Sequence, residues 1–249
     1  MNIRKKILTR CGVLLTAVLV LAPTALAAEA EIPYIPQTVP AAQLAPADQR
    51  GKEDWQLLLV NPWHTVPEGY EIKLATLSNG LQVDERIYDD LDDMLSDCRE
   101  AGLNPIVCSA YRTEATQTRL YRNKVARVRA SGVPEDRVEA EAARWVAKPG
   151  TSEHQTGLAL DIVAAGYQIL DEEQEDTAEQ KWLMENSWKY GFILRYPSEK
   201  SDITGIGYEP WHYRYVGKAA AADIYRTGVC LEEYLGRAVL PAAELTPAR

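Results

Sequence analysis

At residues 150–161 the chain reads GTSEHQTGLALD, and this stretch decides how the rest of the fold is interpreted. His154 and Asp161 can both bind a metal, but on one unbroken strand their spacing would place them on opposite faces. Gly157 lies between them and permits a turn that resets this alternation. We therefore expect a loop that carries His154, followed by a strand that carries Asp161, with both side chains directed at one point.

Asp161 interrupts a run of apolar residues at 158–163. A carboxylate in such a run is unfavourable unless it is paired or binds a metal ion. From this segment alone, a metal site and a hydrogen-bonded buried aspartate beside a loop histidine are equally good interpretations.

A second stretch, YEPWHYRYV at 208–216, adds Glu209 and His212 within an expected aromatic strand. With His154 and Asp161, His212 would complete a set of two nitrogens and one oxygen, which suits a catalytic zinc ion with a fourth position for water. Glu209 would then be free to act as the general base that takes a proton from this water. The alternative is that Glu209 is an exposed acid at the end of the strand.

The hydrophobic pattern along the chain predicts an α+β fold in a single domain. Strands and helices are mixed without regular βαβ repetition, which favours a small, mostly antiparallel sheet flanked by helices. The expected strands cover residues 55–60, 105–110, 158–163, 192–195 and 208–216. The expected helices cover residues 85–101, 113–130, 134–146, 177–190, 218–225 and 231–235.

The composition excludes several classes of protein. The 249 residues include 27 basic and 36 acidic side chains, for a net charge of −9, whereas nucleic-acid binding needs a basic surface. Four cysteines are too few for a disulfide scaffold, and they form no CxxC pair. We therefore expect buried, inert thiols at Cys98, Cys108 and Cys230.

Two further features allow alternatives. His64 lies in a turn-like context that predicts a surface loop, and a role as fourth metal ligand or substrate contact is the alternative. The acidic run at 171–176 predicts a solvated loop, and a lid over the site is the alternative.

The N-terminus has the layout of a secretory signal peptide. A basic segment within residues 1–10 precedes an uncharged, apolar run, and the ALA at 25–27 is a small-x-small cleavage site. We expect a signal peptide at 1–27, with an uncleaved membrane anchor as the alternative. The proline- and alanine-rich residues 28–50 predict a linker, or an arm packed on the domain, before a catalytic domain at 51–249.

The motifs S-x-H-x-x-G-x-A-x-D at 152–161 and E-P-W-H at 209–212 resemble those of the zinc D-alanyl-D-alanine carboxypeptidases of the VanY type. These enzymes belong to the LAS metallopeptidases, a group that includes D,D-dipeptidases and the zinc fold of hedgehog signalling domains. Three further segments match the same family: S-x-Y-R-x-x-x-x-Q at 109–117, LLLVNP at 57–62 and GFILRYP at 191–197. The resemblance implies a hedgehog/D,D-peptidase-like fold.

The same resemblance implies roles for individual residues. One zinc ion per chain would be bound by His154, Asp161 and His212, with Glu209 as the base. Arg112 would stabilise the scissile carbonyl as it becomes an oxyanion. Contacts to the terminal D-amino acid are implied for Ser152, Gln117 and Tyr111.

The expected function is hydrolysis of the C-terminal D-alanine of peptidoglycan stem peptides by a secreted or envelope-bound monomer. Three alternatives are an L,D-carboxypeptidase that acts on tetrapeptide stems, a non-catalytic zinc-bearing wall-binding module, and a secreted interaction protein with structural His and Asp residues. Glu209 and Arg112 argue against a binding module, because binding alone needs neither a base nor an oxyanion donor. The expected partners are stem peptides, without nucleic acid, and a membrane only through an uncleaved N-terminal anchor.

Overall fold

Four antiparallel strands in the order β3-β4-β6-β5 form the sheet on which the candidate site is built. The structure is a computed structural model that describes residues 55–236. The strands cover Pro105–Ser109 (β3), Ala159–Ala164 (β4), His212–Tyr215 (β6) and Phe192–Leu194 (β5). The register pairs Asp161 of β4 with Ser109 on one side and with His212 on the other. Asp161 and His212 are therefore neighbours on adjacent strands.

The alternation of side chains along β4 and β6 separates an apolar face of the sheet from a polar one. Leu160 and Tyr213 point into the main hydrophobic core. Asp161, His212 and Arg214 alternate with them on the opposite face, where they are buried as well. The polar residues thus gather on the face that the main core does not use.

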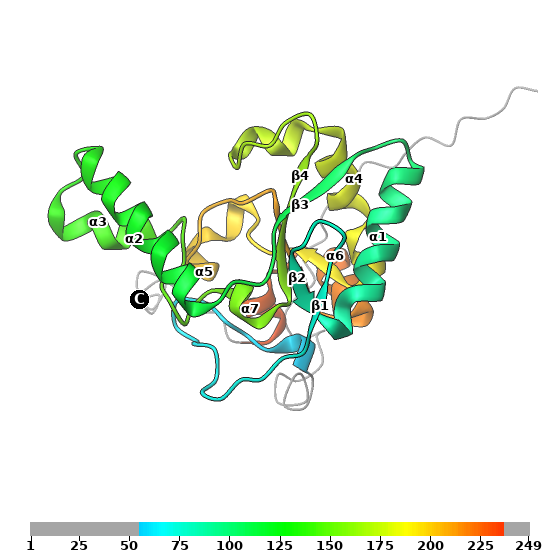
Figure 1. Ribbon diagram of the computed structural model, residues 1–249, viewed down its shortest axis with the longest axis horizontal. Helices are drawn as coiled ribbons and strands as arrows, with labels where there is room; N and C mark the ends of the chain where they lie inside the picture. Colours follow the sequence, from blue (N-terminus) through cyan, green and yellow to red (C-terminus); the bar gives the residue numbers. More distant parts are fainter. Residues whose placement is uncertain (1–54, 237–249) are drawn as a thin grey trace, which may run out of the picture. The chain divides into compact units, whose positions relative to one another are not determined.

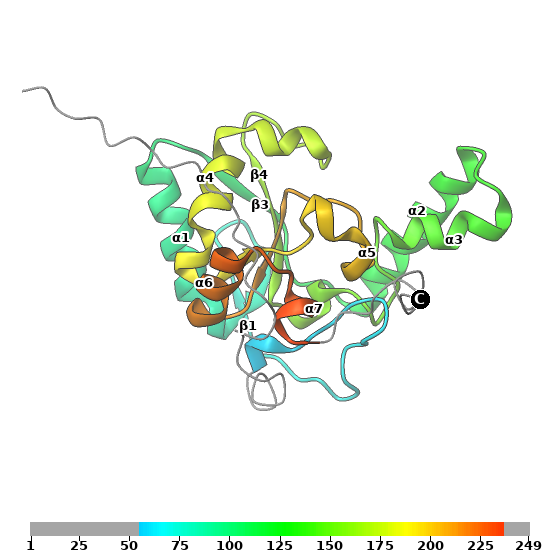
Figure 2. The same cartoon turned by 180° about the vertical axis from the view of Figure 1, so that it is seen from behind.

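Two helices, α1 (Tyr88–Glu100) and α4 (Ala178–Asn186), lie side by side against the apolar face (Figure 1 and Figure 2). Turns of 3-10 helix at Glu85–Ile87 and Ser187–Tyr190 precede α1 and extend α4. The residues of α1 that recur at helical spacing are buried: Leu91, Met94, Leu95 and Cys98. The helices expected at 85–101 and 177–190 are confirmed.

A second buried cluster joins the two ends of the described region. It contains Ile224 from α6 (Lys218–Thr227), Leu231 from α7 (Leu231–Tyr234) and Leu59, which follows the 3-10 turn Trp55–Leu57. A third cluster closes a helical hairpin of α2 (Glu114–Ala130) and α3 (Glu135–Ala143), which lie side by side in both views (Figure 1 and Figure 2). The side chain of Thr113 caps α2 by accepting a hydrogen bond from the Thr116 backbone N–H.

The remaining elements are short. A hairpin of β1 (Leu74–Thr76) and β2 (Gln82–Asp84) was not expected from the sequence. The others are α5 (Ser201–Thr204) and the 3-10 turns Glu153–Thr156, Glu172–Asp176 and Ser198–Lys200. Within residues 55–236, no helix combines the length and the apolar character needed to cross a bilayer. The expected signal peptide, the linker and both ends of the expected catalytic domain lie outside the described residues.

The α+β fold with a small antiparallel sheet is confirmed, but two of the expected strands are wrong in part or whole. Residues 55–60 form no strand, because the carbonyls of Gln56 and Leu58 accept hydrogen bonds from the Arg214 guanidinium instead of a neighbouring strand. The expected strand at 208–216 begins only at His212, whose N–H closes a turn onto the Glu209 carbonyl.

The expectation of buried thiols is wrong for one of the three cysteines. Cys98 and Cys230 are buried and free, whereas Cys108 is free but exposed. Cys108 lies on β3, an edge strand of the sheet, where the register with β4 shifts between Val107 and Ser109. Its position at an edge explains why the apolar run around it did not predict its exposure.

Candidate metal centre and active site

A tight turn brings His154 to the start of β4. The 3-10 turn Glu153–Thr156 ends at Gly157, which has a φ of +72°. A Cβ at this position would lie 2.8 Å from the backbone nitrogen of Asp84, so both the backbone conformation and the space require glycine. The turn allows His154 and Asp161 to lie on the same side of the sheet.

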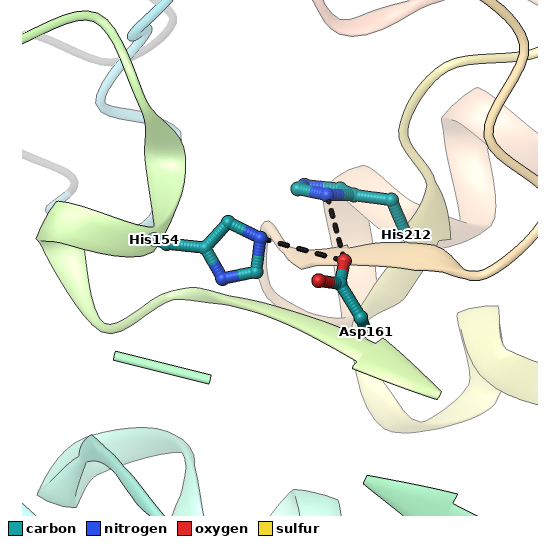
Figure 3. A group of neighbouring side chains, drawn as sticks. All are labelled: His154, Asp161 and His212. Carbon is teal, nitrogen blue, oxygen red and sulfur yellow. Dashed lines mark ion pairs between the residues drawn. The ribbon is translucent and has the colours of Figure 1, made fainter. Parts of the chain in front are cut away.

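The ligand atoms that His154, Asp161 and His212 offer lie within 4.8 Å of one another (Figure 3). Asp161 Oδ1 is 3.4 Å from His154 Nε2 and 3.2 Å from His212 Nδ1. His154 is oriented by its other ring nitrogen, Nδ1, which lies 2.8 Å from the Ala110 carbonyl oxygen. The three side chains converge from a turn and from two neighbouring strands.

The environment of these atoms fits a bound cation. All three side chains are almost fully buried, and Asp161 Oδ1 has no hydrogen-bond partner among the described residues. A buried carboxylate oxygen without a partner is unfavourable, and a cation between it and two imidazole nitrogens would remove this cost. Two nitrogens and one oxygen are the ligand types that catalytic zinc takes from a protein.

Glu209 lies beside this group and lines the groove above it. Its Oε2 is 3.6 Å from His212 Nδ1. Burial raises the pKa of Glu209 to about 8, an effect that the neighbouring His212 only partly offsets. A carboxylate with this proton affinity can take and return a proton near neutral pH.

Arg112 approaches the group from the junction between β3 and α2. Its Nη2 donates to Asp161 Oδ2 at 2.7 Å, which leaves Oδ1 of the same carboxylate facing the histidines. Ser109 Oγ accepts from Nε and Nη2 of Arg112, at 2.9 and 2.7 Å, and Gln117 Oε1 is 3.5 Å from Nη1. Arg112 therefore orients the aspartate while part of its guanidinium lines the groove.

The three expected substrate contacts lie in different surroundings. Ser152 is buried and lines the groove. Gln117 also lines it, and its amide is held on both ends, because Nε2 donates to the Ala147 carbonyl at 2.7 Å and Oε1 faces Arg112. Tyr111 is not among the described residues that line the groove.

The groove has a volume of about 810 Å³. Its walls include Lys124, Trp145 and residues 171–173 of the acidic run at 171–176. The acidic side chains of this run are largely exposed, as expected for a solvated segment, but the run forms the 3-10 turn Glu172–Asp176 and contributes to the groove. His64 does not line the groove; its Nδ1 lies 2.9 Å from Asn61 Oδ1, in the loop that the sequence predicted.

A buried network of charges next to the site was not predicted from the sequence. Glu153, Arg195 and Arg214 are almost completely inaccessible to solvent, and both guanidinium groups donate to Glu153 Oε1. A signal was present, because both arginines interrupt runs of apolar or aromatic residues, just as Asp161 does. The same argument of unfavourable burial would have singled out the two arginines, whereas Glu153 lies in a polar stretch that gives no such signal.

Comparisons with known proteins find carboxypeptidases that are similar to this chain. The model of the family "VanY: D-alanyl-D-alanine carboxypeptidase" matches residues 80–218. A D-alanyl-D-alanine carboxypeptidase of Enterococcus faecalis is 48% identical over 193 residues, which are 77% of this chain and 70% of that protein. The solved structure of VanYB in complex with D-alanine-D-alanine is 48% identical, with a TM-score of 0.68, and the match covers 73% of this chain and 98% of the other.

Two more solved structures bear on metal and substrate. A mutant of the vancomycin resistance D,D-pentapeptidase VanY in complex with Zn(II) is 48% identical, with a TM-score of 0.67 over 73% of this chain and 99% of the other. The LD-carboxypeptidase LdcB is 35% identical, with a TM-score of 0.62 over 76% of this chain and 89% of the other.

Proposed function

Because the chain belongs to the VanY family of D-alanyl-D-alanine carboxypeptidases, we propose that it removes the C-terminal D-alanine from peptidoglycan stem peptides ending in D-alanyl-D-alanine, with zinc as its cofactor. The observation that carries this proposal is the group of His154, Asp161 and His212, whose buried Asp161 Oδ1 lacks a hydrogen-bond partner among the described residues. The family relation and this donor set point to the same zinc-dependent chemistry.

In this proposal His154 Nε2, Asp161 Oδ1 and His212 Nδ1 hold the ion. When bound, zinc lowers the pKa of a water molecule and polarises the scissile carbonyl. Glu209 takes the proton of the attacking water on its carboxylate and passes it to the departing amine of D-alanine. Its position beside His212 and its raised pKa both suit a group that must accept and then release a proton.

Arg112 has two tasks in the proposed mechanism. It holds Asp161 through Oδ2, and it offers its remaining donors to the carbonyl oxygen as negative charge develops there. Gln117, anchored on Ala147, supports the guanidinium, and Ser152 is placed to contact the terminal carboxylate of the substrate. For Tyr111 a substrate contact stays a prediction from the family resemblance alone.

The groove favours a substrate longer than a dipeptide. At about 810 Å³ it has room for residues that precede the scissile bond. An L,D-carboxypeptidase acting on tetrapeptide stems is the second candidate, because the LD-carboxypeptidase LdcB shares the fold at 35% identity. The higher identity to VanY proteins, 48%, favours D,D-specificity.

One experiment tests the proposal and separates the two candidates. The purified protein is incubated with a pentapeptide stem and, separately, with a tetrapeptide stem, and D-alanine release is followed with and without a zinc chelator. Chelator-sensitive release from the pentapeptide is expected. Release only from the tetrapeptide would support the L,D-candidate, and release that resists complete removal of zinc would contradict the proposed chemistry.

The substrate also bears on location. We propose that residues 1–27 direct export, that residues 28–50 act as a linker, and that residues 51–249 form the catalytic domain outside the cytoplasm, where stem peptides of the wall are accessible. Mass spectrometry of the exported protein tests this: a mature chain that begins close after Ala27 is expected. An exported chain that still begins at Met1 would favour an uncleaved anchor.

A further inference from the structure

We propose that Glu153 is a positioning residue for the metal centre, which fixes the tautomer and orientation of the His212 ring. The inference rests on the proposed zinc function and concerns a residue that contacts neither the ion nor the substrate in that proposal. Glu153 would act through His212 alone, by accepting a hydrogen bond from its Nε2–H. The surrounding arginines would hold the glutamate in place.

The two atoms that would form this bond face each other. Glu153 Oε2 is 3.5 Å from His212 Nε2, and both atoms are buried. Neither atom has another hydrogen-bond partner among the described residues. Each is therefore the natural partner of the other, since buried polar atoms without partners are unfavourable.

The other nitrogen of the ring determines what Glu153 must do. His212 Nδ1 lies 3.2 Å from Asp161 Oδ1 and is the atom directed at the proposed zinc position. A neutral imidazole that binds a metal through Nδ1 must carry its proton on Nε2. A carboxylate that accepts this proton selects the correct tautomer, fixes the ring plane and makes Nδ1 a better ligand.

Glu153 is itself held by two arginines through its other oxygen. Oε1 accepts from Arg195 Nε at 2.8 Å and from Arg214 Nη1 at 2.7 Å. Both guanidinium groups and the carboxylate have no exposed side-chain surface. Because the arginines occupy Oε1, Oε2 is left for His212.

The network continues to both ends of the described chain. Arg195 donates from Nη1 and Nη2 to the carboxylate of Glu232 in α7, at 2.9 and 2.7 Å. Arg214 Nη2 donates to the carbonyls of residues 56 and 58. Two buried arginines are thus matched by two buried glutamates, of which only Glu153 faces a proposed ligand.

The presence of two glutamates in one buried network supplies a matched control. Glu153→Gln and Glu232→Gln each remove one negative charge from the same buried network, but only the first changes the partner of His212. In Glu153→Gln the amide oxygen would be drawn to the two arginines, so the NH₂ group would face His212 Nε2–H. A donor facing a donor favours the wrong tautomer of the ring.

The experiment measures zinc affinity by competition with a chelator on the full chain, with the ring tautomer of His212 read by ¹⁵N NMR of the zinc-bound protein. Glu153→Gln should weaken zinc binding about 10–100-fold, the usual effect of losing such an outer partner. It should also shift the ring signals of His212, and excess zinc should restore much of its activity. Glu232→Gln should leave zinc affinity and the ring signals unchanged. Equal losses of zinc affinity in the two variants, or unchanged affinity in Glu153→Gln, would overturn the proposal.

A second variant covers the case in which Glu153→Gln does not fold. Glu153→Asp keeps the charge between the two arginines but shortens the side chain by one methylene, so it cannot reach both the arginines and His212. Weaker zinc binding is again expected, and wild-type affinity would overturn the proposal. These measurements do not depend on the peptide cleaved, so failure of the wild-type protein to release D-alanine would refute the proposed function separately.

Discussion

Two glutamates lie at opposite nitrogens of the His212 ring, and their surroundings differ. Glu153 Oε2 is 3.5 Å from Nε2, and Glu209 Oε2 is 3.6 Å from Nδ1. Burial by itself would raise the pKa of Glu153, but Arg195 and Arg214 outweigh it and hold the pKa well below its usual range. For Glu209 burial dominates, and it raises the pKa to about 8.

In these two glutamates the direction of the pKa shift follows the cations around the carboxylate, because residue type and depth are nearly the same. Both side chains are nearly buried, but only Glu153 is hydrogen-bonded by guanidinium groups. A permanently ionised carboxylate orients a neighbour well and exchanges no proton. A carboxylate with a raised pKa binds and releases a proton more readily near neutral pH. The predictions below test this contrast, in order of decreasing effect on turnover.

The largest effect is expected where both glutamates act, at the ring between them. His212→Ala should lose tightly bound zinc and reduce turnover to background, because three protein ligands become two. Zinc content by atomic absorption and D-alanine release are the measurements. His64→Ala is the control, since His64 lies outside the group and should leave both values unchanged. Full zinc occupancy in His212→Ala would show that the ligand set is wrong.

Glu209→Gln tests the glutamate near His212 Nδ1, which is the proposed base. The substitution keeps the size of the side chain but removes the proton acceptor, so turnover should fall about 10²–10⁴-fold with zinc still bound. The loss should appear mainly in kcat, because the missing interaction operates in the transition state. Excess zinc should not restore activity, in contrast to Glu153→Gln. If the variant loses zinc, Glu209 is a ligand; if turnover is near normal, the base lies elsewhere.

Arg112→Lys tests the cation that contacts Asp161 and lines the groove. Lysine keeps the charge but lacks the planar fork that reaches both Asp161 and the developing oxyanion. Turnover should fall about 10²–10³-fold, the range for losing an oxyanion donor. Arg119→Lys, the same substitution on the exposed surface of α2, should have no effect on kcat. Similar kcat values in the two variants would remove Arg112 from the mechanism.

The smallest effect on turnover is expected for Glu232→Gln, because Glu232 does not contact the His212 ring. Burial would raise the pKa of Glu232, but Arg195 and other partners lower it below its ordinary value. A carboxyl group of this kind stabilises the fold above the pKa of the unfolded chain, and this contribution is lost as the pH falls toward the folded-state pKa.

The wild-type midpoint of thermal unfolding should therefore fall steeply from about pH 5 to pH 3, and less steeply in Glu232→Gln. At pH 7 the variant should be less stable by about 3 kcal/mol, at the low end for breaking a buried ion pair. Circular dichroism melts at several pH values measure both. Identical pH slopes in the two proteins would show that Glu232 does not contribute to acid sensitivity.

Much of the fold could be predicted from the sequence where the signal is local. The helix expected at 85–101 follows from apolar residues one turn apart, and Gly157 correctly indicated the turn that brings His154 beside Asp161. The prediction of a strand at 55–60 was wrong, because an apolar run indicates burial but not which group will hydrogen-bond to its backbone. That partner is the guanidinium of Arg214, which lies more than 150 positions away in the chain.

The sequence by itself indicated the family, the α+β class and the residues proposed to hold zinc, because these depend on short motifs that can be recognised without knowledge of the fold. The motif in the sequence had already singled out Glu209 as the proposed base, whereas only the tertiary structure placed Glu153 between two buried arginines and beside His212. The Asn61 amide donates to Glu232 from 171 positions away, and Glu153 accepts from Arg195 and Arg214, which lie far from it in the sequence. The pKa of a carboxyl group depends on charges close in space, and sequence spacing does not reveal which charges those are.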